Sequence, residues 1–180
     1  MDVVIKEAPI NDENNKKKSG YYICDNLSLF FYKYIFRYAS QMNVMESNAF
    51  YDRYIKNDFE QQHVPFVFEN ICKQYLIRLN RKGLIEEPFE KIGKYYYDNP
   101  MSKTNGEFDI VTLDQNGYIF YEAKFRNSKV NQQMIEKEIE QVKQSGMNSY
   151  KYGFFSKSGY ENITDEHLIL YTLDDLFQEL

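Results

Sequence analysis

The sequence has few of the residues that build covalent or metal-based frameworks. Its 180 residues include two cysteines, Cys24 and Cys72, and two histidines, His63 and His167. Two cysteines are too few for a disulfide framework or a zinc cluster, so we expect each to pack as a small apolar residue. The isolated histidines exclude a histidine-rich site, and any metal must therefore be bound by oxygen ligands.

Long apolar runs and nucleotide-binding glycine motifs are also missing. The longest apolar stretch, around residues 27–31, is far shorter than the ~20 residues that span a bilayer. No signal-peptide pattern follows Met1. None of the eight glycines belongs to a Gly-x-x-x-x-Gly-Lys or Gly-x-Gly-x-x-Gly pattern. We therefore expect a soluble, cytoplasmic protein with no membrane contact and no ATP site.

The charge distribution permits a nucleic-acid partner but does not demand one. The net charge is −5, and residues 161–180 carry six acidic groups and no lysine or arginine. Residues 121–160 carry seven basic and four acidic groups, which gives a local excess of positive charge. A surface that binds nucleic acid is therefore compatible with the acidic total.

Residues 1–60 are predicted to form an appendage to a domain of residues 61–180. Two strand-like runs at residues 3–5 and 21–23 flank a polar loop, which indicates a hairpin. Aromatic and aliphatic residues then recur at helical spacing over 27–38, and a weaker helix is expected over 47–59. An isolated helix of this length is marginal, so we expect its aromatic stripe to be buried against the domain that follows.

The pattern after the appendage predicts a mixed α/β domain. Pro65 suits the first turn of a helix that Gly83 ends, and Asn116-Gly117 predicts a tight turn between two strands. The expected order is α-β-β-β-α-β-β-α. The elements are expected near residues 65–82, 92–97, 108–113, 118–125, 131–145, 152–155, 168–171 and 173–178.

Three charged residues on the second and third of these strands have the chemistry for phosphodiester hydrolysis. Asp109 lies between apolar neighbours, where an acid is costly unless it is paired or bound to a metal. Glu122 and Lys124 share one strand face, and we expect Asp109 on that face as well. Two carboxylates can bind Mg²⁺, which generates hydroxide, and a lysine can stabilise charge on the phosphate.

Each of these residues also has a plainer interpretation. Glu122 and Lys124 could form a solvated pair, because an acid-x-Lys triplet should occur roughly twice by chance in this composition. Glu69, on the preceding helix, could be a third acidic ligand or could pair with Lys73 four residues later. Glu107, two residues before Asp109, could simply end a loop.

In this order and setting the residues resemble the PD-(D/E)XK nuclease superfamily. The resemblance rests on Phe-Glu at residues 68–69, Glu-Phe-Asp-Ile-Val at 107–111 and Tyr-Glu-Ala-Lys-Phe at 121–125. It implies a restriction-endonuclease-like α-β-β-β-α-β core with a mixed central sheet, to which the N-terminal hairpin and helices are added.

The same resemblance implies roles for the candidate residues. Asp109 and Glu122 would be metal ligands, Lys124 the catalytic lysine and Glu69 the acid contributed by the helix. Mg²⁺ or Mn²⁺ would be the cofactor and DNA the substrate. No proline precedes Asp109, although that proline is often lost in the superfamily.

Residues 65–178 are more specifically similar to the C-terminal domain of unknown function of archaeal-type AAA ATPases. The segments at residues 154–160 and 170–173 carry this narrower resemblance, and residues 20–25 are similar to the join after a winged helix. In such proteins a P-loop ATPase and a winged helix come first. The resemblance therefore implies the C-terminal part of an ATPase, or a shortened relative, with an ATPase domain as a possible partner.

Three functions remain open at this point. The first is a Mg²⁺-dependent DNA nuclease, which the acid–acid–lysine set favours. The second is a catalytically inactive nuclease-like module that binds DNA or docks on a protein, which the acidic balance favours. The third is a scaffold whose tyrosines and phenylalanines form a docking surface.

Overall fold

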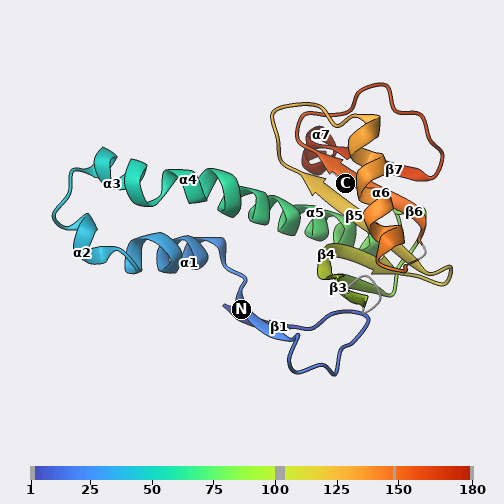
Figure 1. The fold of residues 1–180 in the computed structure, drawn as a ribbon, viewed down its shortest axis with the longest axis horizontal. Coiled ribbons are helices and arrows are strands. Elements are labelled where there is room, and N and C mark those ends of the chain that lie inside the picture. Colours follow the sequence, from blue (N-terminus) through green and yellow to red (C-terminus); the bar gives the residue numbers. More distant parts are fainter. Residues whose placement is uncertain (1–2, 100–103, 148, 179–180) are drawn as a thin grey trace.

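A five-stranded mixed sheet forms the centre of the body at the right of Figure 1. The computed structural model describes residues 3–99, 104–147 and 149–178. Strand order follows the chain, and the first three strands are antiparallel while the last three are parallel. The strands are β3 (Lys91–Asn99), β4 (Thr104–Leu113), β5 (Tyr118–Lys124), β6 (Ser149–Ser156) and β7 (Leu168–Thr172).

Three helices accompany the sheet: α5 (Val64–Arg81), α6 (Gln132–Gln144) and α7 (Leu173–Phe177). The predicted order of elements is thus confirmed as a mixed α/β arrangement. Pro65 lies in the first turn of α5, and Gly83 follows the helix with a positive φ of 66°. Gly117, in the turn between β4 and β5, has a φ of 130°, which favours glycine.

The two faces of the sheet pack against different helices. On one face, Ile110, Ile119 and Tyr121 join Cys72 and Leu76 of α5 in one apolar cluster. On the other face, Val111 and Phe120 pack with Val142 of α6. Alternation along β5 therefore separates an α5 side from an α6 side, as expected for a sheet covered on both faces.

The predicted N-terminal hairpin is present and covers the edge of the sheet. Strands β1 (Val4–Glu7) and β2 (Gly20–Ile23) pair antiparallel. After β1, the amide of Ile10 donates to the carbonyl of Lys94 at 2.8 Å. The side chain of Asn11 donates to the carbonyl of Tyr96 at 2.7 Å and accepts from its amide at 3.1 Å. These bonds satisfy backbone groups of β3 that an open sheet edge would expose.

A helical arm projects from the sheet-containing body (Figure 1). One side of it is the run α1–η1–α2, and the other side leads through α3, α4 and η2 directly into α5. Its elements are α1 (Asn26–Phe30), η1 (Phe31–Phe36), α2 (Ala39–Met42), α3 (Ser47–Tyr54), α4 (Lys56–Asp58) and η2 (Phe59–His63).

The aromatic stripe is buried within the arm, and among the described residues its expected contact with residues 61–180 is limited to the ring of His63. Tyr34 is buried in a cluster with Phe50 and Ile55, all within the arm, and ring contacts reach no further than His63 among the described residues. The hydroxyl of Tyr34 also donates to Asp58 at 2.5 Å. The two sides of the arm therefore bury the stripe between themselves, which meets the need for packing by a local route.

The two cysteines differ from each other. Cys72, on α5, is buried in the core, as expected, whereas Cys24 is exposed, so the expected packing is wrong for Cys24. Among the residues that the structure describes, no helix combines the length and apolar character needed to cross a membrane.

Candidate active site where two strands separate

A β-bulge sets the direction of Asp109. Gly93 of β3 lies opposite Val111 of β4, but Tyr95 lies opposite Phe108. Two residues of β4, Asp109 and Ile110, therefore face one residue of β3, Lys94. Phe108 consequently packs on the α6 side and Ile110 on the α5 side, although both would share one side of a regular strand. Bulges of this kind redirect side chains and are common beside active sites.

Asp109 belongs to an ion-pair group with residues of β3 and β4. The ammonium of Lys94 lies 2.8 Å from the Asp109 carboxylate and 2.9 Å from that of Glu107. Burial lowers the pKa of Lys94, but the hydrogen bonds and charges of Asp109 and Glu107 outweigh burial, and the net shift is upward. Lys94 is therefore a fixed cation whose side chain is 20% exposed, next to the half-exposed Asp109.

Glu122 and Lys124 form a second ion-pair group on the α6 side. The ammonium of Lys124 lies 2.8 Å from Glu122 and 2.7 Å from Glu138 of α6. Burial raises the pKa of Glu122, and the charge of Lys124 opposes that rise only in part. Lys124 is thus held between two carboxylates at the end of β5.

The carboxyl group of Glu69 interacts electrostatically with one acid of each ion-pair group, Asp109 and Glu122. Burial, Asp109 and Glu122 together raise the pKa of this α5 carboxyl group to about 7. Asp109 also contributes to the raised pKa of Glu122. The pairing between β4 and β5 covers residues 110–113 and 118–121, so Asp109 and Glu122 lie just beyond it, where the strands separate. Three carboxylates therefore act on one another at one end of the sheet.

The predicted shared face of Asp109, Glu122 and Lys124 is wrong. The periodicity placed Asp109 with Val111, but the bulge turns it toward Lys94 and away from the α6 side. Glu122 and Lys124 share a face, as predicted. The alternative pair of Glu69 with Lys73 is wrong as well, because Lys73 lies 2.5 Å from Glu7 of β1.

Two members of the site were not singled out as candidates from the sequence. Lys94 pairs with Asp109, and its signal was a single lysine in the middle of an aromatic strand. Glu138 of α6 contacts the candidate catalytic lysine directly, at 2.7 Å. Neither contact follows from spacing alone, because each joins elements that are distant in sequence.

The carboxylates fit a divalent cation by their chemistry. Glu69, Asp109 and Glu122 offer the hard oxygen ligands that Mg²⁺ prefers. Among the described residues no three acids lie close enough together to hold an ion, and ammonium groups pair with Asp109 and Glu122. A cation would therefore have to exchange with Lys94 at Asp109 and with Lys124 at Glu122.

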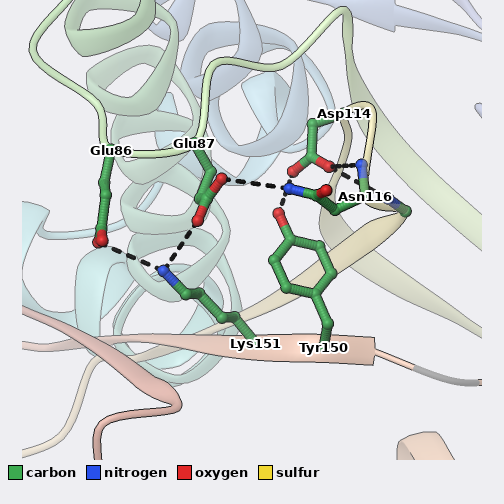
Figure 2. Close-up of polar contacts among 7 residues, drawn as sticks. Glu86, Glu87, Asp114, Asn116, Tyr150 and Lys151 are labelled. Carbon is green, nitrogen blue, oxygen red and sulfur yellow. Dashed lines mark hydrogen bonds and ion pairs between the residues drawn. The ribbon is translucent and has the colours of Figure 1, made fainter.

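A different polar group lies at the opposite end of the same sheet (Figure 2). The buried Asp114 accepts from the amides of Asn116 and Gly117 at 2.7 and 3.1 Å and from the hydroxyl of Tyr150. Lys151 beside it pairs with Glu87 at 3.0 Å. This group ties the β4–β5 turn to β6 and to the segment after α5, which is a structural role.

Comparison with known proteins places the site inside a shared region. The model of a family described as archaea bacterial proteins of unknown function matches residues 31–142. That range contains Glu69, Lys94, Asp109, the Glu122–Lys124 segment and Glu138. An uncharacterized protein of Methanocaldococcus jannaschii is 30% identical over 131 residues, which are 72% of this chain and 28% of that relative. The matched part is therefore less than a third of the relative.

Proposed function

The chain belongs to this family, DUF234, and we propose that it is a Mg²⁺-dependent nuclease domain that cleaves DNA. The observation that carries the proposal is the position of Asp109 and Glu122 just beyond the paired part of β4 and β5, with the Lys124 ammonium 2.8 Å from Glu122. Carboxylates and a lysine at such a point have the chemistry for phosphodiester hydrolysis.

The topology supports a relationship to the PD-(D/E)XK superfamily. The elements α5, β3, β4, β5, α6 and β6 follow the α-β-β-β-α-β order of the restriction-endonuclease-like core, around a mixed sheet. The superfamily pattern also places the first acid on the second strand and the acid-x-lysine pair on the third. Asp109 and the Glu122–Lys124 pair have those positions.

In the proposed reaction the chain supplies ligands, charge and orientation. When bound, Mg²⁺ lowers the pKa of a ligated water and offsets charge on the phosphate. Asp109 and Glu122 would hold the ion, with Glu69 as a further ligand. Lys124 donates hydrogen bonds to a phosphate oxygen or to the attacking water, and Glu138 keeps the ammonium protonated and in place at 2.7 Å.

A second function is favoured by the ion pairs themselves. Lys94 and Lys124 pair with Asp109 and Glu122, so both residues proposed as metal ligands already have partners in the described chain. A nuclease-like module that binds DNA or docks on a protein without cleavage would need nothing more. An ATPase partner belongs to either function and is proposed from the resemblance alone, since the match spans 28% of the relative.

Cleavage assays with matched variants separate the two functions. We expect single- or double-stranded DNA to be cut with Mg²⁺ or Mn²⁺ and not with a chelator. Lys124→Ala should abolish cleavage, whereas Lys137→Ala, an exposed lysine of α6 with no ion pair in the described chain, should not. If no metal supports cleavage, alone or with an ATPase partner added, and Mn²⁺ does not bind, the binding module replaces the nuclease.

A further inference from the structure

A pocket of about 210 Å³ lies between the N-terminal hairpin, α5 and the sheet. Ile5 of β1 and Tyr22 of β2 contribute to one wall, and Phe66 begins the wall formed by α5. Lys94 and Asp109 of the candidate active site line the pocket as well. Drug-sized ligands occupy pockets of roughly 300–1,000 Å³, so this one suits a single small ring system.

One face of α5 presents polar groups to the pocket. Glu69, Asn70, Lys73 and Gln74 line it, at the spacing that brings side chains to the same side of a helix. Lys73 is bound to Glu7. In the described part of the chain, the side-chain amides of Asn70 and Gln74 form no hydrogen bond, and neither is a buried unsatisfied group. Two amides at i and i+4 are therefore available to a ligand.

The charges inside the pocket argue against an anionic ligand. Both ammonium groups are already bound to carboxylates, Lys73 to Glu7 and Lys94 to Asp109. Glu69 adds a further acid. A purely apolar ligand is also disfavoured, because it would remove water from the two amides without replacing its hydrogen bonds. The pocket therefore selects a neutral molecule with apolar faces and a polar edge.

From this geometry we propose that the pocket binds a single nucleobase, with adenine preferred. The aromatic side chains of Tyr22 and Phe66 line the pocket, and stacking on aromatic rings is a general means of holding bases. Asn and Gln side chains pair with the donor and acceptor edge of adenine. Asn70 and Gln74 supply that edge recognition.

The inference rests on the proposed function for the route by which a base arrives. Asp109 and Glu69 belong to both the pocket and the candidate metal site. A strand held at the metal site would therefore bring a neighbouring nucleotide to the mouth of the pocket. Enzymes that modify a base move it out of the stack into a pocket, and the same movement would bring a neighbouring base into this one.

Calorimetric titration with free adenosine in chelator-containing buffer tests the pocket without any cleavage. Adenosine should bind more tightly than uridine, and inorganic phosphate alone should not bind. Asn70→Leu and Gln74→Leu should each weaken adenosine binding about tenfold, as the loss of one edge contact predicts. Gln133→Leu, a matched change of an exposed amide on α6, should leave the affinity unchanged.

Several results would overturn the inference. The inference fails if adenosine gives no heat of binding, or if adenosine and uridine bind with equal affinity. It also fails if Gln74→Leu and Gln133→Leu change the affinity for adenosine equally. Circular dichroism verifies that each variant folds, and Asn70→Asp serves if Asn70→Leu does not. Cleavage without adenosine binding rejects the pocket alone, and adenosine binding without cleavage rejects the nuclease alone.

Discussion

The polar groups at the two ends of the sheet differ in how completely their members are partnered. At the turn end, Asp114 accepts three hydrogen bonds, and Tyr150 and Lys151 are bound to acids (Figure 2). At the other end, burial and the charges of Asp109 and Glu122 raise the pKa of Glu69 to about 7. One group is satisfied internally, and the other has an excess of negative charge.

This difference indicates what each group does. A buried polar network that is fully paired fixes a structure, because every member has a partner to lose. Carboxylates that repel one another reduce stability and are retained where they bind a cation or a substrate. If the proposed function holds, the same sheet combines a structural end with a functional end, and substitutions should separate them.

The largest expected effect is at the structural end. Asp114→Ala removes an acceptor from two turn amides and leaves the hydroxyl of Tyr150 without its partner. We expect a loss of about 3 kcal/mol in the free energy of unfolding, measured by urea denaturation. Asp98→Ala, at an exposed acid of β3, should change stability by less than about 0.5 kcal/mol. Equal losses in the two variants would contradict a structural role for Asp114.

The second largest expected effect is an increase in the free energy of unfolding, and it depends on pH. The pKa of Glu69 is raised, so the folded state keeps this proton to higher pH than the unfolded chain does. The contribution of Glu69 to the free energy of unfolding is therefore fully present below about pH 4.5, and it is lost as the pH rises toward 7. Glu69→Gln removes this pH-dependent loss and should stabilise the protein by about 2 kcal/mol at alkaline pH. This is less than the full shift in the pKa of Glu69 would give, because water reaches the pocket.

Urea denaturation at acidic and alkaline pH measures this effect. The parent and Glu69→Gln should be equally stable at pH 4, where the carboxyl group is protonated in both folded and unfolded states. At pH 8, added Mg²⁺ should stabilise the parent more than the variant, because the ion binds the folded state only. A variant that gains nothing at pH 8 would show that Glu69 is not repelled by its neighbours.

Most of the fold could be predicted from the sequence, because its signals are local. Pro65 and Gly83 delimit α5, Asn116-Gly117 makes the turn, and alternation along β5 predicts its two faces. The packing partner of the arm could not be predicted from the sequence. The aromatic pattern shows that a stripe of side chains is buried, but it does not show which surface covers the stripe.

The sequence predicts most of the residues of the candidate site, but it does not predict how they are arranged. Glu122 and Lys124 share a face because strand periodicity requires it. The bulge at Asp109 breaks that periodicity, and a bulge depends on the pairing of two strands. The contacts of Lys94 and Glu138 likewise depend on tertiary placement.

A smaller effect again concerns the structural end. Tyr150→Phe keeps the ring and removes the hydroxyl that donates to Asp114. Burial and Asp114 raise the pKa of Tyr150, so this donor stays protonated well above neutral pH. We expect a loss of about 1 kcal/mol in the free energy of unfolding, because Asp114 retains its two amide donors. Tyr21→Phe, at an exposed tyrosine of β2, is the matched control and should be neutral.

The smallest effect on stability is expected at the functional end, with the largest effect on activity. Asp109 is 44% exposed, and its partner Lys94 keeps a second carboxylate, Glu107, at 2.9 Å. Asp109→Asn therefore loses an exposed ion pair but also removes repulsion from Glu69 and Glu122. Because exposed pairs contribute about 0–1 kcal/mol, we expect a net change within about 0.5 kcal/mol in metal-free buffer.

The same substitution should abolish metal-dependent cleavage and weaken Mn²⁺ binding, because it removes one charged ligand from the proposed site. Urea denaturation, cleavage assays and Mn²⁺ titration on one preparation measure the three quantities together. A loss of stability as large as that of Asp114→Ala, with no response to metal, would make Asp109 a structural ion-pair partner. The polar groups at both ends of the sheet would then have structural roles, and the proposal of a binding module would replace that of a nuclease.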